Sequence, residues 1–110
     1  MNNIQQYPLI DTQAGIELAG GSEDMHKELL AMLKAMLPEH EQEVLAAFEA
    51  KDLSELAKAA HKLHGACCYT GTPRLKAASK ELELCAKAGG DTQAAFDTFI
   101  ETLHDTDAQL

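Results

Sequence analysis

Apolar residues recur along most of the chain at spacings of three and four, which is the pattern of amphipathic α-helices. The most regular stretch carries Leu53, Leu56, Ala60, Leu63 and Cys67. The next stretch repeats the pattern with Leu75, Ala78, Leu82 and Cys85. We find no run with the alternation, or with the β-branched and aromatic residues, that is typical of strands. The pattern therefore predicts an all-α protein.

Capping residues, glycines and prolines divide this pattern into separate helices. We expect helices near residues 12–18, 23–37, 38–50, 53–70, 72–88 and 91–108. Residues that commonly cap helix N-termini stand before several of them, at Asp11, Ser22, Asp52, Thr72 and Asp91. Pro38 and Pro73 suit the first turn of a helix, so each is taken to open a new one.

The links between the last four helices are very short, and short links make neighbouring helices antiparallel. We therefore predict an antiparallel up-down four-helix bundle from residue 38 onward, with one or two additional N-terminal helices packed across it. Residues 1–8 are expected to form an irregular lead-in, and 9–110 one domain. The apolar set of the helix at 23–37 is Met25, Leu29, Met32, Leu33 and Met36, which core packing explains best.

Charge and cysteine content narrow the classes of function. The formal net charge of the 110 residues is −9, which argues against binding nucleic acid or an anionic membrane. No apolar run approaches the length that spans a bilayer, and Met1 to Tyr7 lack the core of a signal peptide. The three cysteines include the neighbours Cys67 and Cys68, which favours reduced thiols over a disulfide framework. We expect a cytoplasmic protein that is monomeric as an isolated domain.

The segment from Ala60 to Ala66 holds the candidate chemistry. We call the apolar row from Leu53 to Cys67 the seam of this helix. On a helical wheel His61 points away from the seam, and His64 lies between His61 and the seam. Gly65 lies one turn after His61 in a helix interior, where glycine costs about 1 kcal/mol relative to alanine. The missing side chain leaves room for a partner protein beside the imidazole. An exposed imidazole of this kind suits a nucleophile that accepts and donates a phosphoryl group. Lys58, Lys62 and His64 are candidates to offset the phosphate charge.

This block resembles the histidine-containing phosphotransfer (HPt) family. The family motif is His-x-Leu-Lys-Gly, then small residues and a further glycine, and here the chain reads His61-Lys-Leu-His-Gly65 and on to Gly71. His64 replaces the usual lysine. That substitution, with Cys-Cys-Tyr-Thr-Gly and Pro-Arg-Leu after it, is similar to the HPt ends of BarA/GacS-type hybrid sensor histidine kinases.

The resemblance implies that His61 accepts a phosphoryl group from the phospho-aspartate of a receiver domain and passes it to another receiver. It implies no cofactor of the module's own, because the receiver supplies Mg²⁺. Receivers would dock on small residues such as Ala57 and Cys68. No nucleotide-binding motif is present, so we expect no autonomous kinase activity. The chain would be linked, in some settings, to upstream kinase and receiver domains of an inner-membrane sensor.

Two other classes of function compete with this interpretation. A metal site is possible at His61, His64 and Cys68, which share one flank of the helix. Glu23-x-x-His26 and Glu101-x-x-His104 have the spacing of di-iron bundles, although surface charge explains these four residues better. A helical binding module without phosphate chemistry is the remaining alternative, with the methionines as an adaptable stripe. We expect no metal.

Overall fold

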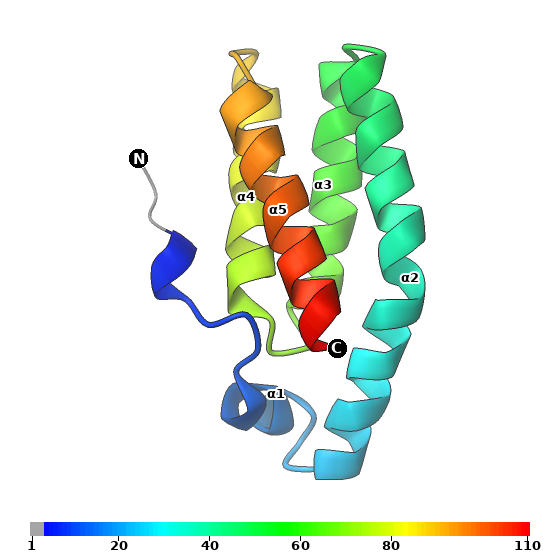
Figure 1. The fold of residues 1–110 in the computed structure, drawn as a ribbon, viewed down its shortest axis with the longest axis vertical. Coiled ribbons are helices and arrows are strands. Elements are labelled where there is room, and N and C mark those ends of the chain that lie inside the picture. Colours follow the sequence, from blue (N-terminus) through cyan, green and yellow to red (C-terminus); the bar gives the residue numbers. More distant parts are fainter. Residues whose placement is uncertain (1–3) are drawn as a thin grey trace.

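The computed structural model describes residues 4–110 and confirms the all-α prediction. Its elements are η1 (Ile4–Gln6), α1 (Thr12–Leu18), α2 (Glu23–Glu49), α3 (Leu53–Cys67), α4 (Pro73–Ala88) and α5 (Gln93–Gln109). Helices α2 to α5 form an antiparallel bundle, and α1 lies across one end of it (Figure 1). Within the expected irregular lead-in, residues 4–6 form a 3₁₀ turn, and residues 1–3 lie outside the described part.

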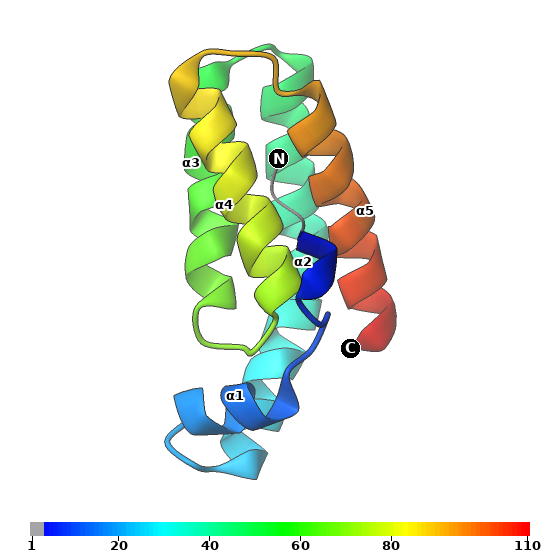
Figure 2. The same ribbon diagram turned by 90° about the vertical axis from the view of Figure 1, so that its left-hand side faces the viewer.

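Helix α2 runs without interruption through Pro38, so the predicted division at this proline is wrong. The buried positions of α2 continue across the proline at spacings of four and three, through Leu33, Leu37, His40 and Val44. Pro38 itself faces solvent. A continuous buried stripe therefore outweighs the cost of a proline inside the helix. As a consequence the whole of α2 belongs to the bundle, and α1 alone packs across its end (Figure 2).

Side-chain caps fix the starts of three helices as predicted. Asp11, Ser22 and Asp52 each accept a hydrogen bond from the backbone N–H three residues on, at 3.0 to 3.1 Å. Thr72 makes no such bond, because its hydroxyl pairs with that of Thr70 at 2.8 Å. The N-cap residue of α5 is Thr92, which makes no side-chain bond, but the predicted Asp91 still caps the start of the helix, because its Oδ1 accepts a hydrogen bond from the Gln93 N–H at 2.9 Å.

The methionines of α2 do not enter the core, contrary to the prediction. Met25, Met32 and Met36 are 45, 59 and 41% exposed. The buried face of α2 is rotated away from them and instead includes His26 and His40, which are 2 and 3% exposed. The remaining core follows the predicted seams of α3 and α4, with Phe96, Phe99 and Leu103 from α5.

Helix α1 is held against the loop between α3 and α4. His26 Nε2 lies 3.0 Å from the carbonyl oxygen of Thr70, so the surface role predicted for His26 is wrong. A side chain at Gly15 would overlap the His26 ring. Gly71 has a φ of +67°, and a Cβ there would lie 2.7 Å from the Asp11 carbonyl oxygen. These close approaches require glycine at both positions. Through them α1 and the start of α2 hold the loop that follows α3 in place.

No helix within residues 4–110 is long and apolar enough to cross a membrane.

Replacing His40 with leucine is expected to stabilise the protein. Neither ring nitrogen of His40 has a hydrogen-bond partner within residues 4–110, and burial lowers the pKa of this imidazole below 6.5. Removing an unpaired buried polar group gains about 1–2 kcal/mol of unfolding free energy. Because the unfolded state takes up a proton more readily than the folded state, the wild type loses stability as pH falls below about 6.5. The gain from His40→Leu therefore grows at lower pH.

Urea denaturation at pH 7.5 and 5.5 measures this effect. The exposed His104, which pairs with Glu41 at 3.0 Å, supplies the control variant His104→Leu. That variant is expected to change the free energy of unfolding by less than about 0.5 kcal/mol. A His40→Leu protein no more stable than the wild type at either pH would contradict the account.

Candidate functional site

The candidate site lies where α3 faces α4, and its centre is a pair formed by His61 and Glu83. These two helices pack against each other more extensively than any other pair in the described residues (Figure 2). His61 Nδ1 lies 3.0 Å from Glu83 Oε2. The His61 side chain is 66% exposed, whereas that of Glu83 is 1% exposed. The predicted exposure of His61 is thus confirmed, and a buried carboxylate lies directly beneath its ring.

Cations of α4 surround the Glu83 carboxylate. Lys87 Nζ lies 2.7 Å from Glu83 Oε2, and Lys80 Nζ lies 3.6 Å from Oε1. Burial alone would raise the pKa of Glu83, but the hydrogen bonds from Lys87 and His61, and the charges of His61 and Lys80, lower it to about 2. Glu83 is therefore ionised at neutral pH and acts only as a hydrogen-bond acceptor.

The ionised Glu83 determines which nitrogen of His61 carries the proton. A carboxylate cannot donate, so Nδ1 must be the donor of the 3.0 Å hydrogen bond. In the neutral imidazole the other nitrogen, Nε2, then holds a free lone pair. Because the ring is largely exposed, this arrangement makes Nε2 a nucleophile held in one orientation.

The surface next to His61 is open at Gly65. This glycine lies inside α3, and a Cβ built on it meets no atom within 4 Å in the described residues. Packing within the chain therefore does not require a glycine here, unlike at positions 15 and 71. The missing side chain leaves the surface beside the imidazole open to another molecule.

His64 lies near His61 but carries no charge at neutral pH. The two ring centroids are 6.4 Å apart. Burial lowers the pKa of His64 below 6.5, and the positive charges of Lys80 and Lys76 lower it further. His64 can therefore act as a hydrogen-bonding group next to the site, but not as the positive charge that a lysine would supply.

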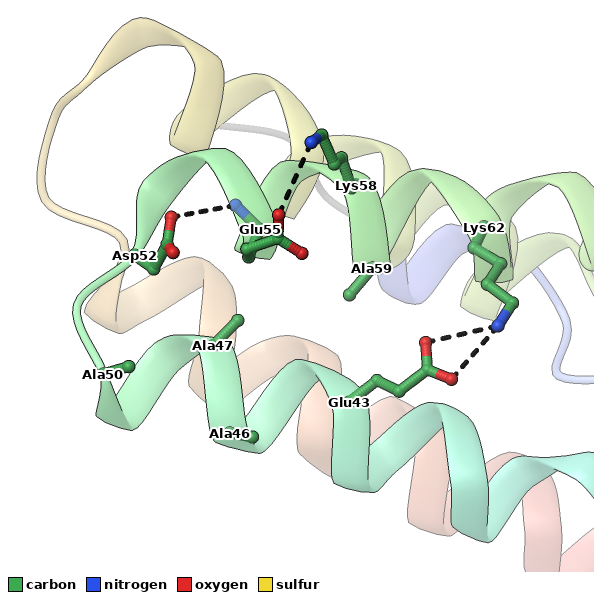
Figure 3. Close-up of a pocket in the computed structure, with 9 residues that line it drawn as sticks. All are labelled: Glu43, Ala46, Ala47, Ala50, Asp52, Glu55, Lys58, Ala59 and Lys62. Atoms are coloured by element: carbon green, nitrogen blue, oxygen red, sulfur yellow. Dashed lines mark hydrogen bonds and ion pairs between the residues drawn. The ribbon is translucent and has the colours of Figure 1, made fainter.

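The structure places the two lysines of α3 differently. Lys62 points toward α2, where its Nζ lies 3.1 Å from Glu43 Oε1 (Figure 3). Lys58 makes an exposed pair with Glu55 at 3.4 Å and borders the pocket that contains His61. Lys58 thus borders the pockets on both sides of α3, whereas Lys62 borders only the one on the α2–α3 side (Figure 3).

The two residues expected to dock a partner are also placed differently. Ala57 lines the pocket beside His61, whereas Cys68 lies partly buried at the end of α3 and outside that pocket. No group of three or more His, Cys, Asp or Glu side chains suited to a metal occurs within residues 4–110. Burial raises the pKa of the Cys67 thiol to about 12, which leaves it unreactive.

Sequence reasoning missed Glu83, the residue that orients His61. One signal was present: Lys80 and Lys87 stand three residues before and four after Glu83, where both reach it on a helix. The apolar row of α4 gave no warning, because Glu83 directly follows Leu82 and is not one of its apolar positions. Only the packing of α3 on α4 shows that this carboxylate is buried.

Removing the carboxylate is expected to change the tautomer of His61. In the wild type the neutral ring should be predominantly protonated on Nδ1, and in Glu83→Ala the fraction protonated on Nε2 should rise. Two-bond ¹H–¹⁵N correlation spectra of the imidazole distinguish the two forms. Equal tautomer populations in both proteins would show that Glu83 does not orient the ring. His104, which pairs with Glu41 at 3.0 Å, supplies the internal control.

Comparisons with known proteins agree with this geometry. A model of the Hpt domain family matches residues 28–109. The sensor histidine kinase GacS of Pseudomonas protegens is 38% identical over 82 residues, which make up 74% of this chain and 9% of that protein. The signal transduction histidine-protein kinase BarA of Escherichia coli (strain K12) is 30% identical over 98 residues, 89% of this chain and 11% of that protein. The chain thus spans about a tenth of the length of these curated relatives.

The fold is likewise found in a solved structure. The crystal structure of the HPT domain from a Shewanella Hpt sensor hybrid histidine kinase superimposes with a TM-score of 0.83 at 23% identity. The match covers 92% of this chain and 89% of that one. From the family model, the relatives and the bundle with its exposed histidine, the chain belongs to the Hpt domain family.

Proposed function

We propose that this chain is the phosphotransfer module of a phosphorelay, in which His61 accepts a phosphoryl group from one receiver domain and passes it to another. Membership of the Hpt family and the likeness to GacS and BarA support this role. The observation that carries it is the 3.0 Å bond from His61 Nδ1 to a buried carboxylate, which leaves Nε2 free and exposed.

The chemistry follows from that geometry. The Nε2 lone pair attacks the phosphorus of an aspartyl phosphate, a P–N bond forms, and the P–O bond to the aspartate breaks with its electron pair. Nδ1 keeps its proton throughout, and Glu83 stabilises the positive charge that develops on the ring. Transfer to a second aspartate is the reverse step. Mg²⁺ and most of the stabilisation of the transferring group come from the receiver, so the module needs no cofactor of its own.

A receiver would approach across Gly65. Beyond this glycine, Met32 and Met36 of α2 and Tyr69 at the end of α3 line an apolar pocket of about 200 Å³, and Tyr69 is 63% exposed. Exposed apolar side chains at one place are typical of a protein interface. We propose that the receiver docks on this face, with Cys68 at its margin, and reaches across His61 to Ala57 on the α4 side. A monomeric module on the cytoplasmic side of a membrane-anchored sensor kinase fits this role.

Incubation with a radiolabelled phospho-receiver tests the proposed acceptor. The wild type and His64→Gln are expected to take up an acid-labile label, and His61→Gln is expected to take up none. A label on His61→Gln would contradict the assignment of the acceptor to His61. Loss of the label in His64→Gln alone would contradict it as well. Binding of the receiver without labelling of any variant would favour the second candidate, a helical binding module, which the exposed Met32 and Tyr69 also suit.

Replacing Gly65 with alanine separates stability from transfer. Because the added Cβ meets nothing within the chain, Gly65→Ala should raise the free energy of unfolding by about 0.5–1 kcal/mol. The same methyl group obstructs the receiver, so the rate of phosphotransfer should fall several-fold. Gly90→Ala is the control, since a Cβ there also meets nothing but lies outside the site. A stabilised Gly65→Ala that transfers at the wild-type rate would contradict docking across this glycine.

A further inference from the structure

A second feature of the site lies on the other side of His61 from Gly65. A pocket of about 570 Å³ extends between α3 and α4 from His61 toward the start of α3. Leu53 and Ala57 line it from α3, and Ala86 lines it from α4. Its volume falls within the range of small-molecule sites, which is about 300–1,000 Å³.

Small side chains create this hollow. Ala57 and Ala86 are 7 and 4% exposed, so they belong to the packed surface between the helices but do not fill the groove above it. Leu53 adds a partly exposed apolar wall. Water in contact with this apolar floor is displaced favourably by an apolar molecule, at roughly 25 cal/mol per Å² of surface removed.

The rim of the pocket is positively charged, in contrast to the chain as a whole. Lys58 and Lys87 both line it, while the formal net charge of the chain is −9. The one carboxylate in the lining, Glu83, is already bonded to Lys87 and His61. Lys58 has a partner in Glu55, but that pair is exposed and therefore weak. Among the lining residues two lysines face one carboxylate, so an anionic group placed at this rim meets an excess of one positive charge.

From these features we propose that the α3–α4 pocket binds small organic molecules that carry one anionic group on an apolar body. The apolar body lies over Ala57 and Ala86, and the anion lies at the rim near Lys58, beside His61. Such an occupant would also obstruct the approach to Nε2. That consequence rests on the proposed function, whereas binding itself does not.

Titration of the ¹⁵N-labelled protein with phenyl phosphate, without any receiver, tests the proposal. We expect saturable shifts of the amides from Ser54 to Lys58 and around Ala86, with a dissociation constant in about the millimolar range or tighter. Phenol, which lacks the anion, and inorganic phosphate, which lacks the apolar body, should each bind at least about ten-fold more weakly, a difference of about 1.4 kcal/mol.

Two lysines of α3 give a matched pair of variants. Lys58→Met should weaken the binding of phenyl phosphate several-fold and leave phenol unaffected. Lys62→Met, which removes a cation from the opposite flank of α3, should change neither. Shifts that do not saturate, shifts confined to the α2–α3 side, or equal affinity for inorganic phosphate would each overturn the proposal. All of these measurements use the unphosphorylated protein, so none of them depends on whether His61 accepts a phosphoryl group from a receiver.

Discussion

The arrangement of the site depends on one buried carboxylate. Glu83 is 1% exposed, and an ionised carboxylate at that depth is costly unless it is paired and hydrogen-bonded. Lys87 and His61 pair with Oε2, and Lys80 lies 3.6 Å from Oε1, which accepts no hydrogen bond within residues 4–110. Lys80 and Lys87 lie on α4 with Glu83, so only the bond to His61 depends on how α3 packs on α4, and a shift by one turn would separate His61 from the carboxylate. The bond from His61 both helps to stabilise that charge and fixes the tautomer and direction of the imidazole, so stability and reactivity are coupled at this point.

Helix α3 presents two different surfaces on either side of its exposed edge. The flank toward α4 holds His61, the buried carboxylate and a positively bordered pocket. The flank toward α2 holds Lys62, bound to Glu43, and leads to the apolar side chains of Met36 and Tyr69. Gly65 lies between the two, where no side chain interrupts the surface. One helix thus serves chemistry on one side and contact with a partner on the other.

The sequence predicted the helices well where one seam and one cap agreed, as in α3 with Asp52 and the row from Leu53 to Cys67. It failed at Pro38, since local propensity favours a break and only the packing of the whole α2 stripe overrides it. The sequence misplaced the methionines because either the face with the methionines or the face with His26 and His40 could be buried. Only packing against the neighbouring helices determines which face of α2 points to the core. The exposure of His61 followed from the wheel, but Glu83 did not, because its burial depends on a contact between residues 22 positions apart.

The position of phosphorus on the labelled protein tests the central claim most directly. Heteronuclear NMR of the phosphorylated, ¹⁵N-histidine-labelled chain shows which ring nitrogen is coupled to ³¹P. The account predicts coupling to Nε2 of His61, with the proton retained on Nδ1 toward Glu83. Coupling to Nδ1 of His61 would contradict it, because the nitrogen bonded to Glu83 would then be the reactive one. Coupling to His64 would contradict it because His61 would not be the acceptor.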